Sequence, residues 1–130
     1  MDKMTDRLTI EEHNGQRIAC VDYRGLNENE MIELTNIHLE FSLNEKLPFL
    51  ADYHGTYVTP EYMKHGRKFA ELTKHIKNKG AFLGVSQVKS FILKGVVIFF
   101  GVNYRAFDSK EKAIEFLTND KSDIKETSLE

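Results

Sequence analysis

The chain has 130 residues and a net charge of −2, and 41% of its residues are hydrophobic while 29% are charged. This length and composition fit one domain with one core, and they exclude a disordered chain. The single cysteine, Cys20, excludes an intramolecular disulfide. The longest apolar run, from Gly95 to Gly101, is too short to cross a bilayer. Because no secretory signal is recognisable either, we expect a cytoplasmic protein.

Five strands and four helices are predicted from the spacing of the apolar residues. In chain order they are a hairpin strand through Leu8 and Ile10, its return strand at 17–23, a helix at 28–45, a strand at 49–53, a helix from Thr59 to Gly80, a strand at 81–86, a helix at 87–100, a strand at 102–107 and a helix from Asp108 to Leu117. Asn14-Gly15 marks the hairpin turn, because both residues tolerate positive φ. Thr59 is a good N-cap before Pro60, and Asp108 with Glu111 fits a capping box.

The alternation of strands and helices predicts the fold class. Strand–helix–strand units need parallel neighbouring strands, whereas the hairpin adds an antiparallel edge. We therefore expect a single α/β domain over residues 1–118, with a mixed, mostly parallel sheet of about five strands that opens with an N-terminal β-hairpin and is covered by four helices. Residues 119–130 are polar and lack periodicity, which predicts a flexible C-terminal tail.

Several segments carry a resemblance to a known family. They are the Thr59-Pro60-Glu61 helix start, the strand from Ala81 to Ser86, the apolar third helix and the ending Tyr104-Arg-Ala-Phe-Asp108. Together with the order of elements, they resemble the STAS fold of anti-sigma-factor antagonists and, more closely, the SpoIIAA-like family of small bacterial proteins. The resemblance covers residues 16–118.

The resemblance implies a non-enzymatic regulatory or protein-interaction domain. SpoIIAA-like domains are also compared with lipid-binding CRAL-TRIO proteins. The resemblance therefore implies, as the alternative function, binding of a small apolar or lipid-like ligand. STAS antagonists carry a phosphorylated serine at the start of their second helix. The corresponding stretch here, from Asp52 to Thr59, contains no serine, so the residues that could take phosphate or an anion are Thr56 and Thr59. The other interpretation of Thr59 is that it only caps the helix.

The third predicted helix is apolar on nearly all sides. At about 100° per residue, Val88, Ile92 and Phe99 are predicted to face the sheet, and a second strip lies on another side of the helix. We expect this strip to be covered by a second copy in a homodimer or by another partner, by packing within the chain, or by a ligand in a pocket under the helix. The residues assigned to this interface or ligand surface are Phe91, Leu93, Val97 and Phe100.

The remaining polar residues predict no catalytic or metal site. No nucleophile–base pair and no metal-ligating histidine spacing is found, so we expect no enzyme, no cofactor and no metal. His38 is predicted to be a part-buried, satisfied histidine, and Cys20 an inert core thiol. Residues 64–105 hold nine basic and one acidic side chain. This stretch could meet an anionic partner or be neutralised within the fold. The basic face of the predicted helix from Thr59 to Gly80 lacks interleaved aromatic residues, so we expect no nucleic-acid binding.

Overall fold

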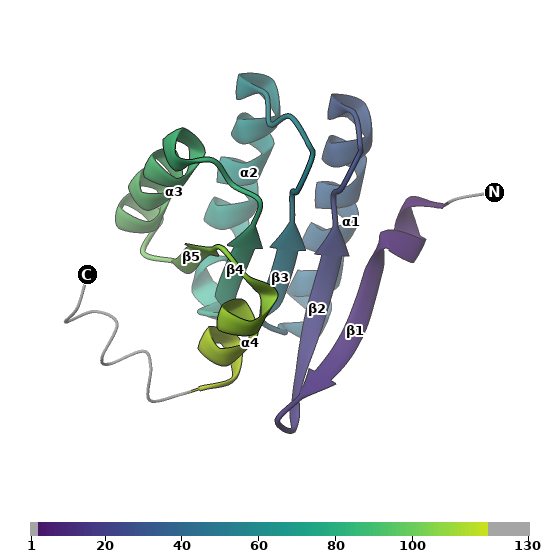
Figure 1. The fold of residues 1–130 in the computed structure, drawn as a ribbon, viewed down its shortest axis with the longest axis vertical. Coiled ribbons are helices and arrows are strands. Elements are labelled where there is room, and N and C mark those ends of the chain that lie inside the picture. Colours follow the sequence, from purple (N-terminus) through teal and green to yellow (C-terminus); the bar gives the residue numbers. More distant parts are fainter. Residues whose placement is uncertain (1–2, 120–130) are drawn as a thin grey trace.

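Figure 1 shows a computed structural model of the chain. Its description covers residues 3–119, except for the side chains of residues 87–92 and of Ile98. The predicted tail therefore lies almost entirely outside the described residues. Within the described part, no helix is both long and apolar enough to span a membrane.

The described elements alternate in the predicted order. They are the 3₁₀ helix η1 (Met4–Arg7), β1 (Leu8–His13), β2 (Gln16–Asp22), α1 (Glu28–Glu45), β3 (Phe49–Asp52), α2 (Pro60–Thr73), the 3₁₀ helix η2 (Lys74–Ile76), β4 (Lys79–Leu83), α3 (Gln87–Phe100), β5 (Asn103–Phe107) and α4 (Lys110–Thr118). Asn14 and Gly15 both have positive φ at the hairpin turn. Thr59 caps α2 through its side chain, and Pro60 occupies the first helical turn.

The five strands form one sheet in the order β1-β2-β3-β4-β5. β1 and β2 are antiparallel, and every later pair is parallel. This arrangement confirms the predicted α/β class with a mixed, mostly parallel sheet. It also places the last residues of β2 and β3, Asp22 and Asp52, directly beside each other.

Helices α1, α2 and α3 contribute to the core on one face of the sheet, and α4 contributes to the core on the other (Figure 1). α1 and α2 pack side by side behind the sheet, α4 covers part of the front, and α3 lies beside β5 and α2. The strands alternate accordingly, because successive side chains point to opposite faces. Ala19 and Val21 of β2 belong to the core under α1 and α2, whereas Ile18 and Cys20 belong to the core under α4.

Several predicted boundaries are wrong, among them the end of α2, both ends of β4 (Lys79–Leu83 instead of 81–86) and the N-cap of α4. The α-helical part of α2 ends at Thr73, and Gly80 lies inside β4 rather than at the end of that helix. A Cβ on Gly80 would come within 2.4 Å of the Phe49 ring, so the glycine serves strand packing. The N-cap of α4 is Ser109, which accepts from the Lys112 amide, and Asp108 instead pairs with the Lys112 ammonium group.

Candidate functional site

A cavity of about 120 Å³ lies between the sheet and the helices α1, α2 and α3. Its walls are mostly aromatic and aliphatic side chains from all of these layers. They include Tyr23, Phe49, Ala51, Tyr53, Tyr62 and Phe82. This volume is close to that of an engineered apolar cavity of about 150 Å³ that binds benzene. A ring-sized apolar body therefore fits the space.

Four buried hydroxyl groups form a chain along one wall of the cavity. The Tyr23 hydroxyl lies 2.8 Å from the Thr35 hydroxyl, which lies 2.7 Å from the Tyr62 hydroxyl. The Tyr62 hydroxyl lies 2.7 Å from that of Tyr53. In each of these three hydrogen bonds either hydroxyl can be the donor. The hydroxyl groups thus form a continuous polar strip in an otherwise aromatic wall.

Burial keeps these tyrosines in their neutral form. Desolvation raises the pKa of Tyr23, of Tyr53 and of Tyr62 above the ordinary tyrosine value. The rings of Tyr23 and Tyr53 are stacked, with centroids 4.4 Å apart. The wall is thus a buried, uncharged surface that combines aromatic rings with hydroxyl groups.

His38 adds a second polar group to the cavity wall. It lies on α1, is only 3% exposed, and packs against Phe49 and Phe69. Its Nε2 is buried and has no hydrogen-bond partner among the described residues, so the prediction of a satisfied histidine is wrong. Desolvation lowers the pKa of His38 to about 3, which keeps the ring neutral. An unpaired buried polar group costs about 1–3 kcal/mol, which a hydrogen bond from a ligand would offset.

Helix α3 closes one side of the cavity. Leu93 and Val96 line it, and Leu93, Val97 and Phe100 are part-buried against the main core. The Lys74 ammonium group lies 5.8 Å from the centroid of the Phe100 ring. The strip that we expected to need a cover thus packs in large part within the chain.

The orientation predicted for α3 needs one correction. Phe99 was predicted to face the sheet, but it is 81% exposed. The structure turns the strip with Leu93 and Val97 toward the core instead, because α3 lies at the β5 edge and packs against α2 as well as the sheet. The side chains of Val88, Phe91 and Ile92 lie outside the described residues.

The cavity meets the surface beside α2. Its lining there includes Gly66, which is half-buried, and Arg67, which is exposed. A Cβ added to Gly66 would meet no atom within 4 Å. A larger side chain at this position would therefore have room to extend beside the opening.

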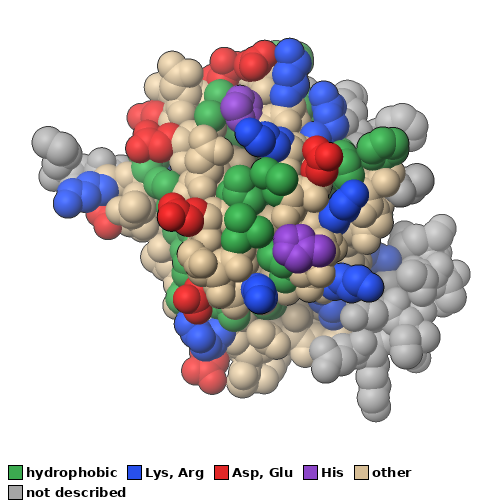
Figure 2. All heavy atoms as spheres, turned by 180° about the vertical axis from the view of Figure 1, so that it is seen from behind, with side chains coloured by type: hydrophobic (Ala, Val, Ile, Leu, Met, Phe, Trp, Pro, Cys, Tyr) green, Lys and Arg blue, Asp and Glu red, His purple; other side chains and the backbone are tan. Residues whose placement is uncertain are grey.

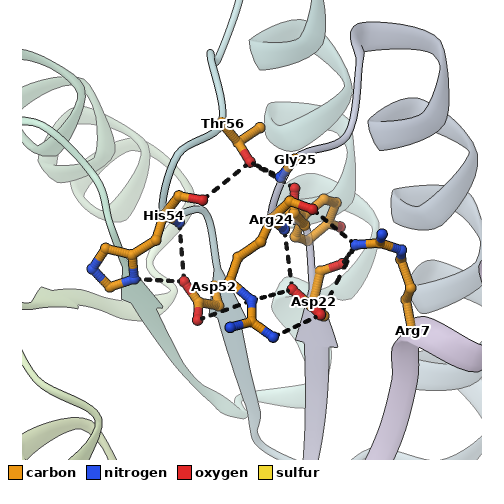
Figure 3. A network of polar contacts seen from close by, with 8 residues as sticks. Arg7, Asp22, Arg24, Gly25, Asp52, His54 and Thr56 are labelled. Atoms are coloured by element: carbon orange, nitrogen blue, oxygen red, sulfur yellow. Dashed lines mark hydrogen bonds and ion pairs between the residues drawn. The ribbon is translucent and has the colours of Figure 1, made fainter.

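A second polar cluster lies at the carboxyl edge of β2 and β3, away from the cavity (Figure 3). Arg24 lies 2.8 Å from Asp22 and 3.9 Å from Asp52. The Asp52 carboxylate also accepts from the backbone N–H of His54 at 3.0 Å and lies 2.8 Å from its ring Nδ1. Arg7 closes the cluster by donating to the backbone carbonyls of Asp22 and Arg24. Every carboxylate here faces a basic group, so the cluster ties the strand ends together.

Thr56 and Thr59 are engaged in hydrogen bonds. The Thr56 hydroxyl donates to the Tyr23 carbonyl at 2.7 Å and accepts from the Gly25 amide at 2.9 Å (Figure 3). The Thr59 hydroxyl accepts from the Tyr62 amide and donates to the Glu28 carboxylate. The Glu28 carboxylate beside the Thr59 hydroxyl would repel an anion bound there. The phosphate or anion site at these two threonines stays a prediction.

The described residues hold no group of three His, Cys, Asp or Glu side chains that could bind a metal ion. Cys20 is half-buried rather than fully buried. Desolvation raises its pKa to about 11, so the thiol stays protonated and unreactive at neutral pH.

No protein-family model matches this chain, and no curated protein matches its sequence. Its fold is similar to that of an uncharacterised protein of the DUF3478 family from Shewanella loihica PV-4, which has a SpoIIAA-like fold. The TM-score is 0.64 at 18% identity, over 85% of this chain and 91% of that one. The fold is SpoIIAA-like. A STAS-domain anti-sigma-factor antagonist from Planctomyces limnophilus is also similar, with a TM-score of 0.58 at 14% identity over 86% of this chain and 98% of that one.

Sequence reasoning missed the cavity wall of this SpoIIAA-like fold, although the sequence carried a signal. An apolar residue followed by Asp-Tyr occurs at residues 21–23 and again at residues 51–53. Each copy ends one of two adjacent parallel strands, so the aspartates project to one face and the tyrosines meet on the other. Only the pairing of β2 with β3 turns this repeat into a site.

Proposed function

We propose that this chain is a non-enzymatic, cytoplasmic binding domain that holds a small apolar ligand, with one neutral polar group, in the cavity under α3. The observation that carries the proposal is the pairing of aromatic walls with a buried His38 Nε2 that has no hydrogen-bond partner in the described part of the chain. Apolar walls with few convergent polar groups are typical of small-molecule sites. The neutral state of His38 and of the tyrosines favours an uncharged hydroxyl or carbonyl at this end of the ligand.

Phenol is a suitable probe because it combines one ring with one hydroxyl. We expect saturable chemical-shift changes in the ¹⁵N spectrum of the labelled protein on phenol titration. The changes should centre on the amides of Ala51, Gly66 and Val96, which line the cavity from three layers. Shifts that never saturate, or that spread evenly over the surface, would contradict the proposal.

Two substitutions locate the binding. Gly66→Leu adds volume where a Cβ meets no atom within 4 Å, so it should block the opening and abolish saturable binding without disturbing the fold. Gly66→Ala makes the same backbone change with little added volume and should keep the binding. Ala51→Val, on the sheet side of the cavity, is a second blocking variant. Unchanged phenol affinity in both Gly66→Leu and Ala51→Val would exclude the cavity.

The polar end of the site is tested with His38→Phe. This change keeps an aromatic ring against Phe49 and Phe69 but removes Nε2. The ratio of phenol affinity to toluene affinity should then be about fivefold to tenfold lower than in the unchanged protein. This is the effect expected for the loss of one hydrogen bond. An unchanged phenol-to-toluene ratio would show that His38 does not contact the ligand.

A second function is favoured by the surface of α3. Phe99 is 81% exposed and Leu72 of α2 is 41% exposed, and both line one groove. Such an exposed apolar patch suits a regulatory contact with a partner or a homodimer. Sedimentation velocity of the unchanged protein and of Phe99→Asp tests the dimer. A monomer in both cases would exclude self-association, and a dimer that persists in Phe99→Asp would place the interface elsewhere.

A further inference from the structure

A surface groove between α2 and α3 adjoins the cavity. Its lining contains the apolar residues Val96, Phe99 and Phe100 and the basic residues Lys64, Arg67 and Lys68. Arg67 and Val96 also line the cavity, so the two hollows share a wall. A ligand longer than one ring can therefore reach from the cavity past Arg67 into the groove.

The groove has an excess of positive charge. Three basic side chains and one acidic side chain, Glu71, line it. Lys64 pairs with Glu61 at 3.3 Å, but within the described part of the chain Arg67 and Lys68 take part in no ion pair. Figure 2 shows the wider pattern, with basic side chains gathered mainly over the α2 half of this face and acidic ones mainly over the α1 half. Among the described residues that line the groove, one acidic side chain faces three basic ones, so the lining keeps a net positive charge.

The cavity and the groove differ in the charge they favour. Inside, neutral tyrosine hydroxyls and a neutral His38 offer hydrogen bonds but no positive charge. At the opening, the Arg67 guanidinium can bind a carboxylate or phosphate in a bidentate geometry while it stays hydrated. A molecule that matches both parts has an apolar body, a neutral polar group at one end and an anionic group at the other.

We infer that the ligand is a small amphipathic anion whose ring-sized body enters the cavity and whose anionic group binds Arg67 in the α2–α3 groove. This inference rests on the proposed function, because it assumes that the cavity is occupied. Beyond the proposed function, the inference specifies that the ligand is an anion, that its charged group lies in the groove, and that Arg67 is the residue that binds this group.

The test compares two probes that differ only in charge. 4-Hydroxyphenylacetate carries a carboxylate, and 4-hydroxyphenylacetamide carries a neutral amide in its place. At low salt the carboxylate should bind about threefold to fivefold more tightly, which is the gain from one well-placed exposed ion pair. The preference should shrink toward equality in roughly 0.5 M salt, where charges are screened over a few ångströms.

Two variants assign the preference to Arg67. Arg67→Gln should bring the two affinities to within experimental error of each other and leave that of the amide unchanged. Arg17→Gln removes one positive charge from an exposed position on β2 and should keep the full preference. A preference that survives Arg67→Gln, or that Arg17→Gln also removes, would overturn the assignment.

The failure of this inference differs from failure of the proposed function. Saturable phenol binding together with equal affinities for the acid and the amide would overturn the amphipathic anion but keep the cavity as a binding site. Absence of saturable phenol binding would overturn both. Binding to vesicles rich in phosphatidylserine without any binding of the free carboxylate would also overturn the inference, because the groove would then contact a membrane surface.

Discussion

Tyr23 and Tyr53 stack face to face, with ring centroids 4.4 Å apart and 8° between their planes. Each follows the aspartate that ends a strand, and these aspartates are partners in the parallel register of β2 and β3. The same strand ends therefore build two different surfaces. The tyrosines form the wall of the cavity, whereas Asp22 and Asp52 meet Arg24 on the opposite face (Figure 3).

The Thr35 hydroxyl is the link between Tyr23 and Tyr62, so its removal should destabilise the fold. Thr35→Val keeps the shape of the side chain but leaves the Tyr23 hydroxyl without this partner. We expect the free energy of unfolding to fall by about 1–3 kcal/mol, the cost of a buried unsatisfied hydroxyl. Urea denaturation measures it. Thr9→Val, an exposed position on β1, is the control and should change stability by less than about 0.5 kcal/mol.

Two glycines should respond oppositely to alanine. A Cβ on Gly80 would lie 2.4 Å from the Phe49 ring and 2.8 Å from the Tyr104 ring, so Gly80→Ala should destabilise the protein by about 1–3 kcal/mol through overpacking. Gly66 lies inside α2 with free space around its Cβ position, so Gly66→Ala should stabilise the protein by up to about 1 kcal/mol. Thermal denaturation of the two variants checks the sign. A Gly80→Ala variant as stable as the unchanged protein would contradict the packing argument.

His38 should make the protein less stable in acid. Its pKa is about 3 in the folded protein and near 6.5 in an unfolded chain, so the unfolded state binds one more proton between these values. Stability is therefore complete above about pH 6.5 and falls by about 1.4 kcal/mol per pH unit as the pH drops toward 3. Urea denaturation across this range measures the slope.

The control for this slope removes the titrating ring. His38→Phe should lower the pH dependence of the free energy of unfolding between pH 6 and pH 4 by about 1.4 kcal/mol per pH unit. His75→Gln, on the exposed part of η2, should keep the original slope. If His38→Phe and the unchanged protein have parallel pH profiles, His38 is not buried in its neutral form.

Arg24 should control the titration of Asp22. The hydrogen bond from the Arg24 side chain is the largest influence that lowers the pKa of Asp22. Arg24→Gln should therefore raise the pKa of this carboxyl toward its ordinary value. Carboxyl ¹³C chemical shifts in a pH titration measure the change. Lys112→Gln, which removes the partner of Asp108 instead, should leave the Asp22 titration unaltered.

The local elements of this protein follow from its sequence because they depend on nearest neighbours. Positive φ at Asn14 and Gly15 makes the hairpin turn, and the Thr59 side chain together with Pro60 starts α2. The alternation of strands and helices then requires parallel pairing, which is why the sheet and its antiparallel edge were predicted correctly.

The site and the orientation of α3 were decided by tertiary structure. Thr35, Tyr53 and Tyr62 are far apart in the chain. Only the packing of α1 and α2 on β3 brings the Thr35 hydroxyl and the Tyr53 hydroxyl each to 2.7 Å from the Tyr62 hydroxyl. Helix α3 is apolar on several sides, so its sequence alone did not specify which side would be buried. Its position beside β5 and α2 turned Leu93 inward and Phe99 outward, because packing depends on where neighbouring surfaces lie and not on hydrophobicity alone.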